Sequence, residues 1–126
     1  MKLLILGTAG QVGRELCRLV WPTGYRLAAF DRDLDITLRE PVFAAVARER
    51  PDIVVNAAAY TAVDRAETEG ALAQLVNATA VGALARAAKE IGAGFVHYSS
   101  DYVFDGSGVK PWREGDATAP LGAYGR

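Results

Sequence analysis

The chain has 126 residues, enough for one compact domain and too few for two. Apolar residues make up 51% of it and charged residues 23%, which supports a packed core and argues against disorder. Fourteen basic residues against fifteen acidic ones give a formal net charge of -1, and this balance argues against an electrostatic nucleic-acid binder. Cys17 is the only cysteine, so the composition excludes a disulfide framework and a thiolate metal cluster.

Apolar runs alternate with helical patterns along the chain. Short apolar runs at 3–6 and 53–55 indicate buried parallel strands, and further strands are expected at 26–30, 34–36 and 95–99. Helices are expected over 12–20, from a Thr37–Glu40 capping box to the residue before Pro51, and over the Ala-rich stretch 71–91. This order predicts the α/β class, with a Rossmann-type doubly wound parallel sheet.

The stretch 105–126 differs from the rest, because it holds five glycines and two prolines and has no sustained periodicity. It is expected to be a long loop, and loops of this length in compact domains are usually functional. The layout calls for a closing strand or helix after it. We therefore expect the sheet to be truncated before its last elements.

A glycine-rich turn follows the first expected strand. Gly7, Gly10 and Gly13 fit a Gly-x-x-Gly-x-x-Gly pattern, and an amphipathic helix comes directly after it. Glycines at such a turn let the backbone approach a pyrophosphate, whose charge the helix N-terminus stabilises. The pattern alone is weak, and a strand-to-helix turn without a ligand is the alternative.

Asp31 ends the second expected strand, 18 residues after Gly13. A carboxylate there can accept hydrogen bonds from the adenosine ribose hydroxyls, which favours NAD over NADP. Arg32 beside it could instead pair with a 2′-phosphate, and a solvated charged turn is the third possibility. The choice between NADH and NADPH therefore stays open.

The carboxyl ends of the expected strands should share one edge of the sheet. Gly7, Asp31, the run 56–58 and the pair 99–100 each follow an expected strand, so all should line one crevice. The small residues at 57–59 leave room for a flat ring, although they could also serve close packing alone. On the last strand, alternation places Tyr98 and Ser100 on one face, and His97 and Ser99 on the other. His97 is the only histidine, and we expect a structural role for it.

These features resemble the extended short-chain dehydrogenase/reductase superfamily. Within it, the segments NAAAYTAVDRAE at 56–67, VNA at 76–78 and YSSDYVFDG at 98–106 closely resemble the dTDP-4-dehydrorhamnose reductases, as does the run from Pro111 to Gly125. The resemblance covers essentially the whole chain. It implies residues 1–126 to be the N-terminal, NAD(P)-binding Rossmann domain, with the substrate-binding C-terminal portion outside the chain.

The resemblance also implies the catalytic groups. The family pattern is a Ser or Thr, a Tyr, and a Lys four residues after the Tyr. Carried over, Ser100 holds the substrate's C4 carbonyl oxygen and Tyr124 gives that oxygen a proton. The tyrosine needs a nearby cation to act near neutrality, and the family lysine would fall at position 128. The chain of 126 residues is therefore expected to be inactive alone.

Further residues are assigned by the same resemblance or by the strand-end argument. Asp101 and Tyr102 join Ser100 as substrate-binding residues, because an aromatic side chain at 102 is suited to sugar contact, although it could also be a core aromatic. Related dehydratases carry a glutamate at the position of Tyr102, so its absence here favours reduction over elimination. The cofactor-binding set is Gly7, Gly10, Gln11, Val12, Gly13, Asp31, Asp35, Ile36, Ala57, Ala58, Ala59, Tyr60, Thr61 and Tyr98. Some family members bind magnesium near the position of Glu15, but its partner residues are absent here and we expect no metal.

The leading functional expectation is an enzyme that reduces dTDP-4-dehydro-6-deoxy-L-mannose to dTDP-L-rhamnose with NADPH or NADH. The alternatives are a non-catalytic subunit resembling the regulatory subunit of methionine adenosyltransferase, and an isolated nucleotide-binding half. The apolar run 3–6 is shorter than a signal peptide or a membrane span requires. We therefore expect a cytoplasmic protein with a dTDP-sugar substrate and no nucleic-acid or membrane partner; a homodimer is left open.

Overall fold

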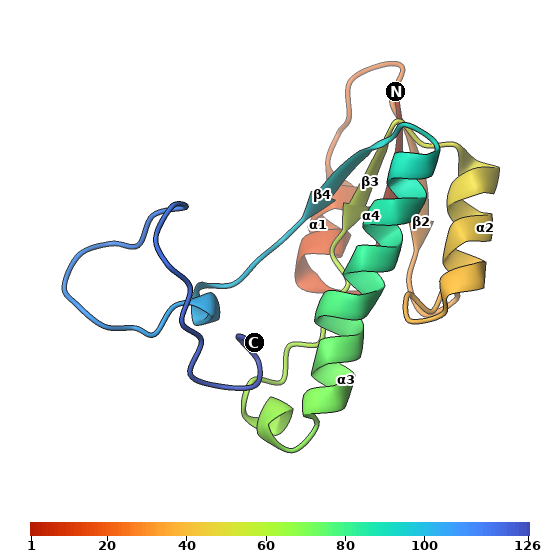
Figure 1. Ribbon diagram of the computed structural model, residues 1–126. Helices are drawn as coiled ribbons and strands as arrows, with labels where there is room; N and C mark the ends of the chain where they lie inside the picture. Colours follow the sequence, from red (N-terminus) through yellow and green to blue (C-terminus); the bar gives the residue numbers. More distant parts are fainter.

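The computed structural model describes all residues, 1–126, as a parallel sheet with helices on both faces and a long loop that leaves it (Figure 1). The strands are β1 (Lys2–Leu6), β2 (Arg26–Phe30), β3 (Ile53–Asn56) and β4 (Gly94–His97), in the order β2-β1-β3-β4. All neighbouring pairs are parallel. The expected α/β class and doubly wound parallel sheet are confirmed.

The helices divide between the two faces. In Figure 1, α1 (Gln11–Arg18) lies behind the sheet, while α2 (Arg39–Glu49) and α4 (Ala80–Glu90) lie side by side in front of it. Alternation along β1 sends Leu4 and Leu6 into the larger core under α2 and α4, and Leu3 and Ile5 into the smaller core on the α1 side. A central strand that is buried on both faces explains the continuous apolar run of its sequence.

The expected strand at 34–36 is wrong, because these residues form consecutive turns. The Leu34 N–H donates to the Asp31 carbonyl at 3.2 Å. The Asp35 carboxylate accepts the N–H of Thr37 at 2.9 Å and its hydroxyl at 2.7 Å, and these bonds lower the pKa of Asp35. Leu34 and Ile36 are still buried in the larger core, so their alternation reflects burial without strand pairing. The side-chain oxygen of Thr37 is used in this turn, and the capping box expected from it is also wrong.

The Ala-rich stretch forms one continuous helical segment, Gly70–Glu90, in three parts. α3 (Gly70–Gln74) leads into a π-helical turn at Leu75–Thr79, and α4 follows. By length and composition this helix could cross a membrane. Core helices commonly have the same composition, however, and four buried residues of α4 belong to the larger core: Ala80, Leu84, Ala87 and Ala88.

The chain after β4 runs away from the sheet edge as an extended loop (Figure 1). Its one regular element is a 3₁₀ turn at Asp101–Val103, and 105–126 contains no helix or strand, as expected. β4 ends at His97, two residues earlier than the sequence predicts. The alternation of faces expected for Tyr98, Ser99 and Ser100 therefore does not apply.

Candidate functional site

A cleft of about 620 Å³ lies at the carboxyl edge of the sheet, where the four strands end. Ten of the predicted cofactor-binding residues line it: Gly7, Gly10, Gln11, Val12, Asp31, Ala57, Ala58, Ala59, Thr61 and Tyr98. Asn56, His97, Ser99 and Tyr124 complete the lining. Four other predicted residues, Gly13, Asp35, Ile36 and Tyr60, lie outside it. Gly7, Asp31, residues 56–58 and Ser99 thus converge as expected from parallel strand ends, whereas Ser100 does not line the cleft.

The three glycines of the turn serve different purposes. Gly7 has a φ of +78°, and a Cβ there would lie 2.5 Å from the Ala58 nitrogen. A Cβ on Gly13 would collide with the carbonyl oxygen of Gly7. Gly10 differs, because its φ is −70° and a Cβ would meet only the Gly7 oxygen, at 3.3 Å. Gly7 and Gly13 are therefore required by packing. Gly10 lines the cleft, and the space that a side chain would fill there is left open.

Asp31 is held against the glycine turn. Its carboxylate accepts the N–H of Ala9 at 3.0 Å, and its own N–H donates to the Asp33 carboxylate at 2.7 Å. The N–H groups of Gly7 and Thr8 both donate to the Phe30 carbonyl, which joins the turn to the end of β2. The carboxylate therefore stands at the cleft edge beside the N-terminus of α1, where a ribose could reach it.

Asn56 and His97 join the ends of β3 and β4. Asn56 is 1% exposed; its amide oxygen accepts the Ala58 N–H at 3.1 Å and its amide nitrogen lies 3.2 Å from the His97 Nδ1. An amide N–H can donate to that ring nitrogen only when the nitrogen carries no proton. Asn56 and His97 are opposite each other in the register of β3 and β4, so this pairing gives His97 a structural partner.

Tyr60 points away from the cleft because its backbone and side chain are both engaged elsewhere. The Asn77 amide accepts the Tyr60 N–H at 2.8 Å and donates to the Tyr60 carbonyl at 2.9 Å. The hydroxyl of Tyr60 donates to Glu69 at 2.7 Å. Asn77 lies in the π-helical turn, a local distortion that is frequent at functional sites. Asn77 is not among the predicted site residues, although the segment VNA at 76–78 is part of the family resemblance.

The stability of the folded chain at acid pH should depend on Glu69. Bonds donated by the Tyr60 hydroxyl and by the Arg65 guanidinium hold the pKa of Glu69 below its ordinary value of 4.5. A lowered folded-state pKa contributes stability that is present above the unfolded value and is lost as pH falls through the folded value. We expect Glu69→Gln to flatten the pH dependence of urea unfolding below about pH 4.5. An unaltered acid limb would contradict the pairing, and the exposed Glu40→Gln is the control.

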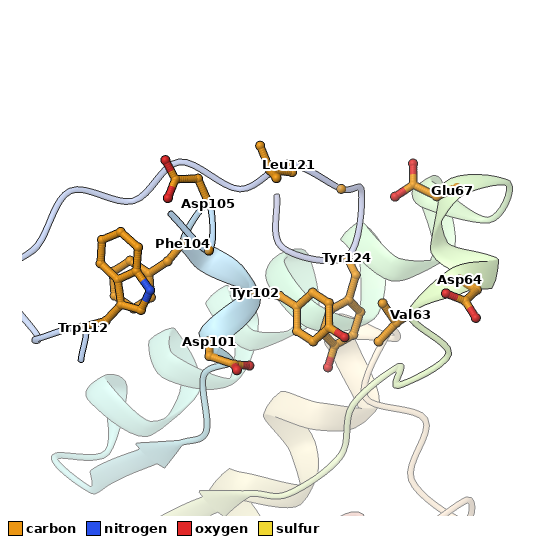
Figure 2. Close-up of a pocket in the computed structure, with 12 residues that line it drawn as sticks. Val63, Asp64, Glu67, Asp101, Tyr102, Phe104, Asp105, Trp112, Leu121 and Tyr124 are labelled. Atoms are coloured by element: carbon orange, nitrogen blue, oxygen red, sulfur yellow. The ribbon is translucent and has the colours of Figure 1, made fainter. Parts of the chain in front are cut away.

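A second pocket, of about 470 Å³, lies between the 3₁₀ turns and the C-terminal loop (Figure 2). Asp101 and Tyr102 line it, as do Asp64, Glu67 and Asp105. Phe104 and Trp112 stack in parallel at its side, with ring centroids 4.6 Å apart. The lining is aromatic and acidic, so it is suited to polar, uncharged groups such as hydroxyls.

Tyr124 lines both the cleft and the second pocket. Its ring packs edge-on against Tyr102, with centroids 5.4 Å apart and an interplanar angle of 87°. Ser100 lines neither pocket. Its hydroxyl oxygen accepts the Tyr102 N–H at 3.1 Å and so caps the 3₁₀ turn. Tyr124 therefore lies where the cleft and the second pocket meet, and Ser100 directly precedes Asp101, which lines the second pocket.

No group of three or more His, Cys, Asp or Glu side chains is close enough to hold a metal ion. Glu15, the residue near which some family members are expected to bind magnesium, pairs with Arg18 at 2.9 Å on the exposed side of α1.

The fold and the cleft together define a Rossmann-type nucleotide-binding protein. The chain belongs to the family described as the RmlD substrate binding domain, which it matches over residues 1–126. A dTDP-4-dehydrorhamnose reductase from Escherichia coli K12 is 54% identical, over 99% of this chain and 43% of its own length. The chain thus spans less than half of such relatives.

Solved structures give the same family. A dTDP-4-dehydrorhamnose reductase from Clostridium acetobutylicum is 41% identical with a TM-score of 0.95, over 99% of this chain and 45% of that one. The Bacillus anthracis reductase, solved in complex with NADP, is 38% identical with a TM-score of 0.94, over 98% of this chain and 45% of that one. A UDP-glucose 4-epimerase from Brucella ovis, 21% identical with a TM-score of 0.86, shares the fold.

Proposed function

We propose that residues 1–126 are the NAD(P)-binding portion of a reductase that converts dTDP-4-dehydro-6-deoxy-L-mannose to dTDP-L-rhamnose. In this proposal the substrate-binding C-terminal portion lies outside this chain. The proposal is supported by the Escherichia coli relative, of whose length this chain covers 43%. The observation that carries the proposal is the position of Tyr124, whose side chain lines both the cleft at the sheet edge and the second pocket. A reductase needs a proton donor where cofactor and substrate meet.

The cleft has the features that a dinucleotide requires. Gly10 leaves the space that a Cβ would fill, directly before the first turn of α1, where free N–H groups favour a phosphate. The carboxylate of Asp31 can accept hydrogen bonds from ribose hydroxyls, and the small side chains at 57–59, which line the cleft, leave room for a flat ring. A nicotinamide cofactor bound there supplies the hydride. In our proposal the protein's part is to bind it, orient it and keep its ring beside Tyr124.

The second pocket is proposed to hold the sugar. Asp101 and Tyr102 would contact sugar hydroxyls, and Tyr124 would give a proton to the C4 oxygen as that oxygen gains negative charge. Ser100 is proposed to act on the same oxygen, and its present bond to the Tyr102 N–H shows that its hydroxyl is held at this turn. A lysine four residues after Tyr124 would favour proton transfer near neutrality.

The names of the relatives favour the enzyme over a non-catalytic subunit. Five of the matched relatives at 50% identity or more are dTDP-4-dehydrorhamnose reductases. A sequence 49% identical is a probable ketoreductase of a related dTDP-sugar from Streptomyces antibioticus, so substrate choice within the 4-keto sugars is part of the test. We propose a cytoplasmic enzyme whose partners are its substrate and cofactor, without a nucleic-acid or membrane partner. A homodimer is left open.

The test is NADPH and NADH oxidation by the complete reductase, given enzymatically made dTDP-4-dehydrorhamnose. The complete protein is expected to form dTDP-L-rhamnose, and residues 1–126 alone are expected to be inactive. Equal rates from both would refute the division between the two portions. Cofactor binding without turnover by the complete protein would favour the regulatory-subunit alternative.

Cofactor preference should depend on the charge of Asp31. Asp31→Asn removes the charge but keeps an oxygen that can accept the Ala9 N–H, so the glycine turn is retained. We expect it to improve NADPH relative to NADH by about 1–3 kcal/mol, because a carboxylate repels the 2′-phosphate. Asp31→Ala should change the ratio of the NADPH and NADH affinities by the same amount, while weakening the binding of both cofactors. Titration of each variant with both cofactors measures this, and an unchanged ratio would remove Asp31 from the ribose site.

A further inference from the structure

Glu67 connects two segments that are far apart in sequence. It ends the 3₁₀ turn Asp64–Glu67, and its carboxylate accepts the N–H of Ala123 at 2.7 Å across 56 positions of sequence. In Figure 2 it lies on the turn facing the loop that carries Tyr124. The side chain of Glu67 is exposed, so this bond is not a requirement of the core. Because Glu67 also lines the second pocket, the bond ties the loop to the wall of that pocket.

The loop around Tyr124 has few other attachments. From residue 117 to 126, two backbone N–H groups donate to the rest of the chain: Ala119 to the Val103 carbonyl at 2.9 Å, and Ala123 to Glu67. The second of these is adjacent to Tyr124. A loop without helix or strand lacks the repeated backbone hydrogen bonds that hold residues in place. This one bond therefore contributes strongly to the position of Tyr124.

The glycines on either side of Tyr124 allow close approaches. A Cβ on Gly122 would lie 2.7 Å from the Glu67 carboxylate, so the small residue lets that carboxylate reach the next N–H. A Cβ on Gly125 would collide with the carbonyl oxygen of Tyr102. Tyr124 is thus bracketed by contacts to Glu67 on one side and Tyr102 on the other. Together these contacts fix its position over the junction of the two pockets.

We propose that Glu67 is a positioning residue for Tyr124, which it fixes by holding the peptide N–H of Ala123. This inference rests on the proposed role of Tyr124 as proton donor. Glu67 acts as a hydrogen-bond acceptor of the right length, and its charge is not the essential property. A glutamine at this position keeps an acceptor oxygen at the same reach. An aspartate keeps the charge but is one methylene shorter.

Substitutions of Glu67 in the complete reductase distinguish the effect of side-chain length from the effect of charge. We expect Glu67→Ala and Glu67→Asp to lower kcat by about 10- to 100-fold, since small misplacements of a reacting group have effects of this size. The KM for NADPH should stay within about twofold, because the dinucleotide cleft does not include Glu67. Glu67→Gln should restore kcat to near the parent value. Glu114→Ala, an exposed glutamate on the same loop that lines neither pocket, is the matched control.

The reverse pattern, with Glu67→Asp active and Glu67→Gln inactive, would overturn the proposal and assign a charge or acid–base role instead. Equal activity of all three variants would overturn it too. Gly122→Ala perturbs the same contact from the opposite side, and we expect it to lower kcat without changing the KM for NADPH.

Amide hydrogen exchange at Ala123 tests the contact without any reductase assay. Loss of one hydrogen bond is expected to speed exchange by about tenfold in Glu67→Ala, and Glu67→Gln should keep the slower rate. Unchanged exchange in Glu67→Ala would overturn the proposal even if activity fell. If the parent protein showed no reductase activity, the proposed function would fail, whereas faster exchange would still support the hold of Glu67 on the Tyr124 loop.

Discussion

Tyr124→Phe is expected to lower kcat of the complete reductase by about 10²- to 10⁴-fold, the range that a positioned general acid contributes. The substitution removes one hydroxyl and keeps the ring, whose edge-on contact with Tyr102 holds the loop. The carbonyl oxygen of the substrate would then gain charge without a proton donor. Binding of cofactor should change little, because the rest of the cleft is untouched.

Steady-state rates with dTDP-4-dehydrorhamnose, at saturating NADPH and over a range of pH, give the measurement. Tyr25→Phe is the matched control, since Tyr25 stacks on Trp21 at 5.6 Å and packs in the smaller core on the α1 side. A Tyr124→Phe enzyme with parental kcat would refute the assignment of the proton donor. A raised KM with unchanged kcat would place the hydroxyl in substrate binding alone.

The central strands β1 and β3 could be predicted from sequence because they are buried on both faces and therefore appear as continuous apolar runs. The same reasoning failed at Leu34 and Ile36, which alternate like a strand and are buried like one. Three aspartates between and around them form turns instead, through bonds within two or three residues. Local side-chain chemistry thus overrode the apolar pattern. A strand also needs a pairing partner, which no local pattern can reveal.

The cleft at the sheet edge was predictable because parallel strands bring their carboxyl ends together whatever loops follow them. The second pocket was accessible only through family resemblance at Asp101 and Tyr102. The hold of Asn77 on Tyr60 spans 17 positions and that of Glu67 on Ala123 spans 56. Such contacts depend on the course of irregular loops, for which neither hydrophobic period nor strand parity gives any signal. In our proposal, the contact made by Glu67 also fixes where Tyr124 lies.

Gly10→Val is expected to weaken binding of NADPH and NADH by about 10- to 100-fold, in proportion to the loss of one or two charge-assisted hydrogen bonds to a phosphate. The backbone at Gly10 has a φ of −70° and a ψ of 170°, which valine can adopt. A Cβ at this position would approach the Gly7 oxygen at 3.3 Å. Because Gly10 lines the cleft, the added methyl groups are expected to enter the space proposed for the pyrophosphate.

Substitution at Gly13 provides the contrast that makes this result interpretable. A Cβ there collides with backbone atoms of Gly7 and Thr8, so Gly13→Ala should lower the free energy of unfolding by about 1–3 kcal/mol through overpacking. Gly10→Val should cost about 1 kcal/mol, from its N-cap preference and from the 3.3 Å approach of its Cβ to the Gly7 oxygen. Urea unfolding and fluorescence titration on the same samples measure both quantities. Parental affinity in a folded Gly10→Val protein would show that the glycine turn does not bind phosphate, because the side chain would then stand in unoccupied space.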